Sequence, residues 1–352
     1  MNMNLTNLII TPELLRTISE IDEFNGGWKV QNNLNPDYLT KLRHVATIES
    51  IGSSTRIEGS KLTDDEIESL LGEVGQGSFA HRGEQEVVGY AEVMETVFEN
   101  FEHIAITENY IKQLHISLLR HSSKDARHRG EYKKHSNSVE AFDGAGNSLG
   151  VVFETTSAFD TPKQMQELVY WARESLEDKS YHPLIVIALF NVVFLAIHPF
   201  QDGNGRLSRV LISLLMLKAG YAYIPYSSLE SIVEKNKDAY YLALQRTQKT
   251  LKGETDWLPW LGFFLRSLKR QKDHLKAKTD SLEQYSHLSQ ECVIIMQYLD
   301  THGRITISEA YKFITNVSKP TVKNRMAELV KLGLIERHGK ARATWYSKLS
   351  KA

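Results

Sequence analysis

The sequence predicts a mainly α-helical fold that carries one β-hairpin and ends in a small basic domain. Three observations support this prediction. Apolar residues recur at helical spacing through most of the chain, a glycine-containing turn separates two short runs within residues 137–155, and positive charge gathers after residue 288. With 352 residues, the chain is long enough for two or three domains, each with its own hydrophobic core.

The helix predictions rest on apolar spacing and on signals at helix ends. Thr63 and Glu66 form the Thr-x-x-Glu pattern of a capping box, and Gly72 can end the helix that begins there. The run 184–197 is apolar except at Asn191 and is shorter than the roughly 20 residues that cross a bilayer, so we expect a buried core helix. Further helices are predicted at residues 37–52, 84–101, 107–120, 162–177, 207–218, 236–250 and 257–278.

One stretch departs from the helical pattern. Residues 137–142 and 149–155 flank a turn at 143–147, and this composition is typical of a β-hairpin. Gly144 and Gly146 resemble part of a dinucleotide-binding loop, but the third glycine is missing and no helix is predicted to follow. We therefore expect these glycines to serve the turn.

Residues 288–352 differ from the rest of the chain in charge and in pattern. They hold eleven Lys and Arg against five Asp and Glu, net +6, which leaves −7 for residues 1–287. Three helices followed by a hairpin form the plan of a winged helix-turn-helix domain. The helices are predicted at 289–300, 306–314 and 317–330, and the strands at 334–337 and 344–347, on either side of a basic turn at 338–342.

The predicted order of domains is an N-terminal helical region at 1–100, a helical core with the hairpin at 101–270, a connector helix at 271–287 and the basic domain at 288–352. Cys292 is the only cysteine, which excludes a disulfide within the chain and a zinc site built from several cysteines. No basic segment precedes an apolar run at the N-terminus, so we expect a cytoplasmic protein without a membrane segment.

The most informative segment is residues 198–209, His-Pro-Phe-Gln-Asp-Gly-Asn-Gly-Arg-Leu-Ser-Arg. Pro199 prevents the preceding helix from continuing, and two glycines precede an apolar helix that begins near Arg206. A glycine loop that enters a helix presents free backbone N–H groups and the positive end of the helix dipole, which suits phosphate. Arg206 and Arg209, one helical turn apart, can add charged donors there.

Two further side chains of this segment suit the chemistry of a nucleotide. Asp202 lies just before the phosphate cradle, and a single carboxylate beside several phosphate oxygens suits Mg²⁺. The neutral imidazole of His198 can accept a proton from an attacking hydroxyl at physiological pH. The segment therefore indicates a site that activates a phosphate group.

The segment matches, at every defined position, the signature H-x-F-x-[DE]-G-N-G-R-x-x-R, and the chain resembles the Fic family over about residues 33–269. The 137–155 hairpin is similar to the target-docking flap of that family, and the aromatic stretch 256–264 is similar to its later helices. The resemblance implies a Fic-type helical core that transfers AMP from ATP, with Mg²⁺, to a Ser, Thr or Tyr hydroxyl of a target protein or of itself. It also implies a homodimer.

The resemblance assigns a role to each residue of the site. His198 would be the catalytic base, Asp202 would hold Mg²⁺, and Phe200 would anchor the loop in the core. The residues that would bind ATP are Gly203, Asn204, Gly205, Arg206 and Arg209 at the phosphates, and Tyr241, Tyr240 and Gln248 near the adenine.

Residue 205 favours one of the reactions known in this superfamily. The phosphorylating branch has Lys at the matching position, where it would fill part of the phosphate cradle. Gly205 therefore favours nucleotidyl transfer over phosphoryl transfer.

A second motif, Ser54-Thr55-Arg56-Ile57-Glu58-Gly59, lies far upstream. Gly59 can cap the end of a helix, and a structural role of this kind is expected. The Ser-x-x-x-Glu-Gly pattern also resembles the inhibitory motif of the family, in which Glu58, with Ser54, would occupy Arg209 and displace the γ-phosphate. A carboxylate and a phosphate compete for the same guanidinium, which makes such inhibition physically reasonable.

The basic domain and the direction of the reaction leave alternatives open. Residues expected to suit DNA phosphates are Lys319, Lys323 and Arg325 on the third helix, and Lys340 and Arg342 on the turn. Such domains also dock proteins or form dimers. The chain could be a DNA-binding regulator whose core senses nucleotide, although the intact His198 and Asp202 oppose this, or an enzyme that mainly removes AMP from a modified target.

Overall fold

The computed structural model describes the backbone of residues 5, 7–30, 36–72, 79, 81–135, 137–142, 148–285, 288–314, 317–339 and 344–349. The chain divides into two compact units, Met1–Asp273 and His274–Ala352. The division falls inside the long helix α11, Leu258–Tyr285, so the residues predicted as a connector belong largely to that helix. The regions predicted at 1–100 and 101–270 lie together in the larger unit.

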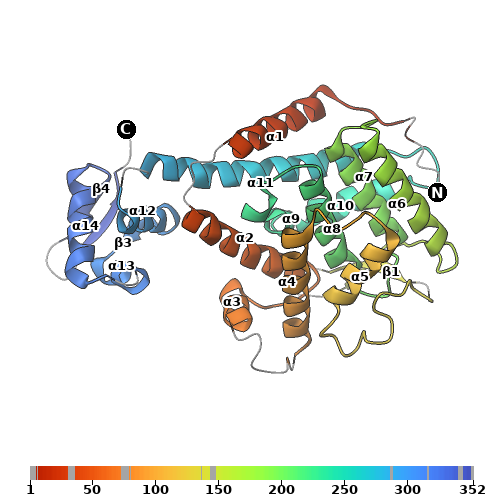
Figure 1. The fold of residues 1–352 in the computed structure, drawn as a ribbon, viewed down its shortest axis with the longest axis horizontal. Coiled ribbons are helices and arrows are strands. Elements are labelled where there is room, and N and C mark those ends of the chain that lie inside the picture. The colour runs from red at the N-terminus through yellow and green to blue at the C-terminus, as the bar shows by residue number, and fades with distance from the viewer. Residues whose placement is uncertain are drawn as a thin grey trace. The chain divides into compact units, whose positions relative to one another are not determined.

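The larger unit is built mainly from helices, as Figure 1 shows. In chain order they are α1 (Pro12–Val30), α2 (Pro36–Ile57), α3 (Asp64–Gly72), α4 (Arg82–Asn100), α5 (Glu108–Leu118), α6 (Thr161–Glu177), α7 (Pro183–Ile197), α8 (Asn204–Lys218), the 3₁₀ turn η1 (Ile224–Tyr226), α9 (Leu229–Glu234), α10 (Lys237–Gln248) and the first part of α11. This mainly helical architecture is the one that the sequence predicts.

Two apolar helices form the centre of this unit. Every residue of α7 from Leu184 to Ile197 is buried, and so is α8 from Arg206 to Leu217. Helix α7 packs against α6, α8 and α10, while α8 also contacts α2, α4 and α5. The loop 198–203 that joins α7 to α8 is therefore anchored at both ends in the most buried part of the unit.

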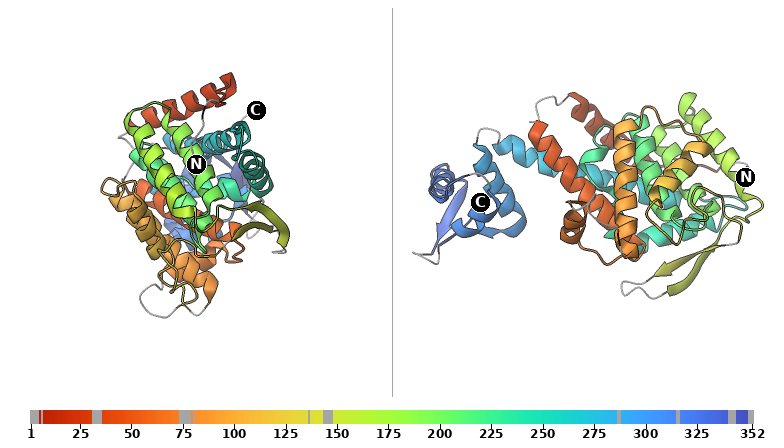
Figure 2. Two further views of the ribbon diagram at one scale, coloured as in Figure 1. Left: turned by 90° about the vertical axis from the view of Figure 1, so that its right-hand side faces the viewer. Right: turned by 60° about the horizontal axis from the view of Figure 1, so that its bottom comes forward.

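The predicted hairpin consists of β1 (Ser138–Phe142) and β2 (Ser148–Glu154), which pair in antiparallel fashion. The register shifts between Val139 and Glu140 and again between Ala141 and Phe142. In the right-hand view of Figure 2 the hairpin projects from the helices of the larger unit. The turn predicted at 143–147 lies outside the described residues.

The smaller unit combines three helices with a short antiparallel sheet of strand order β3-β5-β4. After α11, its elements are α12 (Gln290–His302), β3 (Arg304–Ile305), α13 (Ile307–Phe313), α14 (Lys319–Lys331), β4 (Ile335–His338) and β5 (Trp345–Lys348). The side chains of Ser289, Thr306 and Ser318 cap the three helices by accepting hydrogen bonds from first-turn N–H groups, which explains where each helix begins.

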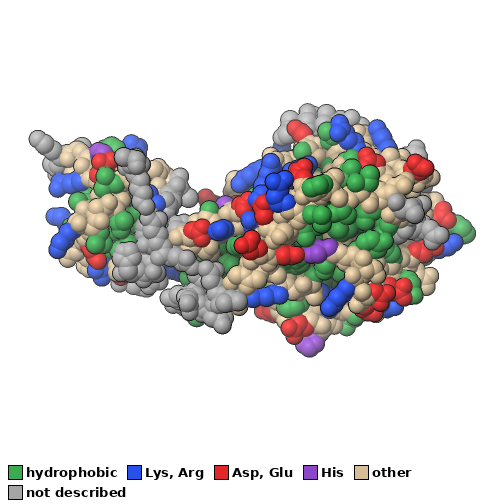
Figure 3. Space-filling view, turned by 90° about the horizontal axis from the view of Figure 1, so that it is seen from above, with side chains coloured by type: hydrophobic (Ala, Val, Ile, Leu, Met, Phe, Trp, Pro, Cys, Tyr) green, Lys and Arg blue, Asp and Glu red, His purple; other side chains and the backbone are tan. Residues whose placement is uncertain are grey.

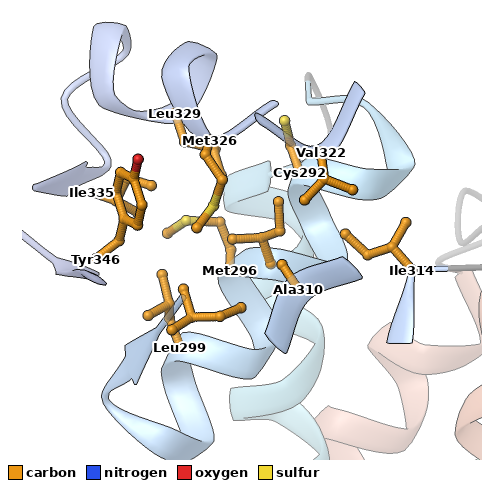
Figure 4. Close-up of a cluster of buried hydrophobic side chains, with 12 residues drawn as sticks. Cys292, Met296, Leu299, Ala310, Ile314, Val322, Met326, Leu329, Ile335 and Tyr346 are labelled. Atoms are coloured by element: carbon orange, nitrogen blue, oxygen red, sulfur yellow. The ribbon is translucent and has the colours of Figure 1, made fainter. Parts of the chain in front are cut away.

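Buried apolar side chains from all three helices and from β3, β4 and β5 form one core in the smaller unit (Figure 4). Cys292 is fully buried in this core and serves as a small apolar side chain. Charge differs between the units. In Figure 3, Lys and Arg side chains show along one edge of the smaller unit with a few acidic side chains near them, and basic and acidic side chains are also interspersed on the larger unit.

Several elements escaped prediction from the sequence, namely α1, η1, α9 and the short strand β3. Helix α1 contains Gly26 and Gly27, which disfavour a helix, but tertiary contacts stabilise it. Phe24 lies edge-on to Tyr223 with ring centroids 5.2 Å apart, and the Asn25 amide donates to the Gly220 carbonyl at 3.0 Å.

Within the ranges given above, no helix is both long enough and apolar enough to cross a membrane.

Close packing at one glycine of α4 gives a stability prediction. A Cβ at Gly89 would overlap the carbonyl oxygen of Leu118 at the end of α5. Since neither backbone can shift freely, Gly89→Ala should lower the free energy of unfolding by about 3 kcal/mol. Gly26→Ala is the matched control, because a Cβ at this exposed helical position meets nothing within 4 Å. It should raise the free energy of unfolding by about 0.5–1 kcal/mol. Urea unfolding of both variants measures the difference, and equal effects would contradict the packing argument.

Candidate active site

His198 lies at the point where α7 ends. Its backbone N–H donates to the Phe194 carbonyl at 2.8 Å, and its backbone is left-handed, with φ 53° and ψ 59°. This conformation is unfavourable for a residue with a Cβ, so surrounding contacts must hold it. Burial, together with the nearby Lys133 cation, lowers the pKa of His198 to about 4. The imidazole is therefore neutral at physiological pH and can accept a proton.

The loop after His198 is closed by one asparagine. Asn204 Oδ1 accepts from the Phe200 N–H at 2.9 Å, and Asn204 Nδ2 donates to the Phe200 carbonyl at 2.7 Å. Phe200 is fully buried, in keeping with its expected role as an anchor, and its ring stacks on His115 with centroids 3.8 Å apart. Asn204 therefore fixes the width of the loop as well as beginning α8.

His115 is a part of the site that the sequence did not reveal. Its Nδ1 accepts from the Gly130 N–H at 2.8 Å, so the ring proton lies on Nε2, which donates to the Asp202 carbonyl at 3.0 Å. Burial lowers the pKa of His115 to about 4, which keeps this tautomer neutral. The available signal was a histidine on the apolar face of α5, beside Leu114 and Leu118.

The N-terminus of α8 points into the loop. Gly203 adopts φ 79° as the residue before the helix, and helical hydrogen bonding begins with the N–H of Leu207, which donates to the Gly203 carbonyl. The N–H groups of the first helical turn therefore have no acceptor within the helix. Together with the helix dipole they form a site that suits an anion.

Two arginines of α8 strengthen this site. Arg206 and Arg209 are both buried, and their charges are partly balanced by carboxylates. Within the described part of the chain, Arg206 Nε and Arg209 Nη1 are buried N–H groups without a hydrogen-bond partner, and Arg206 Nη1 has no hydrogen bond but lies 3.5 Å from the Glu86 carboxylate. Buried donors of this kind are costly unless a ligand satisfies them, so the arrangement fits the phosphate groups of a nucleotide.

Asp202 lies beside these arginines. Its Oδ1 accepts from the Gly203 N–H at 2.6 Å and from Arg206 at 3.3 Å, while Oδ2 accepts from Arg82 at 3.0 Å. Burial opposes ionisation, but Arg206 and the Gly203 N–H hold the pKa of Asp202 below its ordinary value. The described residues contain no group of three or more His, Cys, Asp or Glu that could hold a metal. A lone carboxylate fits Mg²⁺, which takes most of its ligands from water and phosphate.

The upstream motif meets the loop at Arg209. Arg209 Nε donates to Ser54 Oγ at 2.8 Å, and Nη2 donates to the Ser54 carbonyl at 2.9 Å and to Glu58 Oε1 at 2.8 Å. Burial alone would lower the pKa of Arg209, but the Glu58 carboxylate raises it above its ordinary value. Residues more than 150 positions apart in the sequence thus form one charge cluster.

The Glu58 carboxylate also reaches the N-terminus of α8. A Cβ at Gly205 would overlap Glu58 Oε1, so the carboxylate lies against the backbone of the first helical turn. The turn after α2 holds Glu58 there, since Gly59 is left-handed with φ 101°. Arg56 braces the same turn by donating to Glu234 at 2.7 Å and to Asp64 at 2.8 Å.

The three residues predicted near the adenine lie on α10. Tyr240 and Tyr241 are close to the Arg209–Glu58 pair, whose charges act on both phenols, although burial is the main reason that both pKa values are raised. Gln248 is buried two helical turns further along α10. Among the described contacts, none joins Gln248 to the loop at 198–209.

Known proteins resemble this chain at the level of sequence. Residues 105–216 match the model of the Fic/DOC family. A protein adenylyltransferase Fic of Drosophila melanogaster is 26% identical over 318 residues, which are 89% of this chain and 54% of the relative. The counterpart of Drosophila grimshawi is 27% identical over 258 residues, 72% of this chain and 48% of the relative. The chain thus spans about half the length of the curated relatives it matches.

Solved structures share the fold. A Fic family protein from Desulfovibrio desulfuricans G20 superposes with a TM-score of 0.61 at 22% identity and covers 98% of each chain. A Fic domain containing signaling protein from Bacteroides thetaiotaomicron VPI-5482 superposes with a TM-score of 0.57 at 24% identity, and the match covers 74% of this chain and 97% of that one. Residues 105–216, the part of this chain that matches the Fic/DOC family model, include the entire loop at 198–209.

Proposed function

We propose that this protein transfers AMP from ATP to the hydroxyl of a Ser, Thr or Tyr side chain of a target protein. The observation that carries the proposal is the pair of buried arginines at the N-terminus of α8, which keep buried N–H groups without hydrogen bonds that fit phosphate, next to a neutral His198. The domain match and the adenylyltransferase relatives support the same reaction.

In this mechanism the His198 imidazole accepts the proton of the target hydroxyl. The hydroxyl oxygen forms a bond to the α-phosphorus of ATP as the bond to the β-phosphate oxygen breaks, so AMP is transferred and pyrophosphate leaves. The N–H groups of Asn204, Gly205 and Arg206 and the two guanidinium groups bind the phosphates and stabilise the negative charge. Mg²⁺ held by Asp202 would neutralise charge on the phosphates as the bond breaks.

Glu58 is proposed to inhibit this reaction. Its carboxylate lies where the helix dipole and the N–H groups of α8 attract an anion, and it occupies a donor of Arg209. A γ-phosphate bound beside Arg209 would be repelled by the Glu58 carboxylate, because both groups would bond the same guanidinium. The inhibited and active forms would thus differ in which anion, carboxylate or γ-phosphate, lies beside Arg209.

The hairpin is the proposed docking site for the target. In the described part of the chain β1 and β2 form a two-stranded sheet, so the outer edge of each strand has no partner strand. An extended segment of the target could pair with one of these edges and bring its hydroxyl toward His198. Self-association as a homodimer stays a prediction.

The smaller unit is proposed to be a winged helix-turn-helix domain, on the strength of its three helices and sheet. Of the residues expected to suit DNA, Lys319 and Lys323 are exposed on α14, whereas Arg325 is paired with Glu291 and Glu328. Lys340 and Arg342 lie outside the described residues. Arg325 would have to leave these ion pairs to contact a DNA phosphate, and DNA binding stays a prediction.

The first prediction concerns Glu58. Glu58→Gly should raise AMP transfer, including self-modification, by about 10- to 100-fold, since a charge-assisted hydrogen bond to the γ-phosphate is worth about 1.5–3 kcal/mol. Intact-mass measurement after incubation with Mg²⁺ and each nucleoside triphosphate would identify the transferred group. The double variant with His198→Ala is the control. An unchanged level of modification would count against inhibition by Glu58, and incubating an AMP-modified target with the same proteins would reveal removal of AMP.

The second prediction concerns His198 and pH. His198→Ala should lower transfer by about 10²–10⁴-fold while ATP binding persists. Because the pKa of His198 is lowered to about 4, the imidazole accepts protons above that pH and loses this ability as the pH falls through it. Lys133 keeps this pKa low, whereas the Glu58 and Asp202 carboxylates raise it. The rate of transfer by the Glu58→Gly variant should therefore show no step from His198 between about pH 5 and 8. A step in the pH–rate profile with its midpoint near 6.5 would show that the pKa of His198 is not lowered.

The third prediction concerns Arg82 and the metal. Arg82 is half-exposed and bonds the carboxylate proposed to bind Mg²⁺, so it competes with the metal. Arg82→Ala should tighten Mn²⁺ binding by about 2- to 5-fold, as expected for an exposed ion pair. Electron paramagnetic resonance of Mn²⁺ with a non-hydrolysable ATP analogue measures this directly. Arg120→Ala, which breaks an exposed pair with Glu92, is the matched control and should leave Mn²⁺ binding unchanged.

A further inference from the structure

Lys133 is a buried lysine that the mechanism above does not use. It is 4% exposed, and its ammonium group donates to Asn137 Oδ1 and Thr155 Oγ1, both at 2.8 Å, and to the Ile197 carbonyl at 2.9 Å. Its backbone N–H donates to the Pro199 carbonyl at 2.8 Å. All three protons of the ammonium group are therefore used, and its contacts reach three separate segments of the chain.

These contacts have a common geometry. Asn137 directly precedes β1 and Thr155 directly follows β2, so they are the two ends of the hairpin. They also contact each other, with Thr155 Oγ1 2.8 Å from the Asn137 carbonyl. Ile197 and Pro199 are the two neighbours of His198 in the chain. A single residue thus ties both ends of the hairpin to both sides of the proposed base.

The same contacts help to hold His198 in its left-handed conformation. The backbone there is unfavourable by about 1–2 kcal/mol and persists only if neighbouring contacts determine it. Lys133 satisfies the carbonyl before His198 and the carbonyl after it. A further hydrogen bond holds the loop after His198, because the Asn137 amide donates to the Phe200 carbonyl at 2.9 Å.

We propose that Lys133 is a positioning residue that fixes the hairpin, and with it a docked target, relative to the imidazole of His198. This inference rests on the proposed transfer reaction and goes beyond it by naming the residue that links target docking to the base. The ATP phosphates bind at α8, which Lys133 does not contact among the described residues. Loss of Lys133 should therefore slow transfer without weakening nucleotide binding.

The positive charge of Lys133 has a second consequence. It acts on the imidazole in the same direction as burial and helps to keep the pKa of His198 low. Methionine is neutral and only one heavy atom shorter than lysine, so it would keep much of the packing and lose both the three donors and the charge. Lys133→Met and Lys133→Arg are therefore the informative pair.

The experiment uses the full-length chain with Glu58→Gly as the parent. Self-modification with α-labelled ATP and Mg²⁺ gives the rate at saturating ATP and the KM for ATP. Titration calorimetry gives the affinity for a non-hydrolysable ATP analogue. Lys133→Met should lower the rate by about 10- to 100-fold, as expected for a small misplacement of reacting groups, and change KM and affinity less than twofold. Lys133→Arg, which keeps the charge and several donors, should recover much of the rate.

Controls separate positioning from general damage. Lys218 also donates to backbone carbonyls, those of Phe101 and Glu102, but at the far end of α8, and Lys218→Met should transfer at the parental rate. Thr155→Val removes one acceptor of Lys133 and should give an intermediate rate. Hydrogen exchange of the hairpin strands at 138–142 and 148–154 should accelerate in Lys133→Met, while exchange of α7 should change little.

The outcomes distinguish this inference from the proposed function. A parent that modifies nothing would reject the transfer reaction, and hydrogen exchange would still test the tether. A parent that transfers, together with an unchanged rate or unchanged hairpin exchange in Lys133→Met, would overturn the positioning role. A rate loss accompanied by an equal loss of ATP affinity would also overturn it.

Discussion

The guanidinium of Arg209 is a positive charge buried inside the protein, and the surrounding residues must compensate it. Charge in a buried position is tolerated only with hydrogen bonds and an opposite charge nearby. Ser54 and Glu58 supply both from the end of α2. The contact draws the N-terminal helices against the α7–α8 pair, so the position of the loop, the position of Glu58 and the packing of the larger unit are set together.

The remaining contacts keep a short loop rigid by using side chains in place of regular secondary structure. Asn204 pairs with both backbone groups of Phe200, His115 binds the Asp202 carbonyl, and Lys133 bonds the carbonyl on each side of His198. Each of these groups is buried, where a hydrogen bond is strong and a missing one is costly. Under the proposed function, the reacting groups are thereby held in place before any substrate binds, and such preorganisation increases the rate of phosphate chemistry.

Prediction from sequence succeeded where the signal is local. The spacing of residues 198–209 indicates a helix end, a glycine turn and a helix start, and the long apolar run indicates α7. It failed where tertiary contacts decide. Helix α1 contains two glycines and is stabilised by distant partners, while His115 and Lys133 act through residues that are far away or that have no motif. The ion pairs of Arg325 could likewise not be seen from a count of positive charges.

The contact between Glu58 and the backbone at Gly205 makes the residues allowed at these two distant positions depend on each other. Any side chain at 205 would occupy the volume that the carboxylate now fills, so the two positions cannot vary independently. A larger residue at 205 would displace the Glu58 carboxylate from this position, and the inhibition proposed for Glu58 would be lost with it. One substitution at 205 would thus change both the proposed phosphate cradle and the proposed inhibition through Glu58.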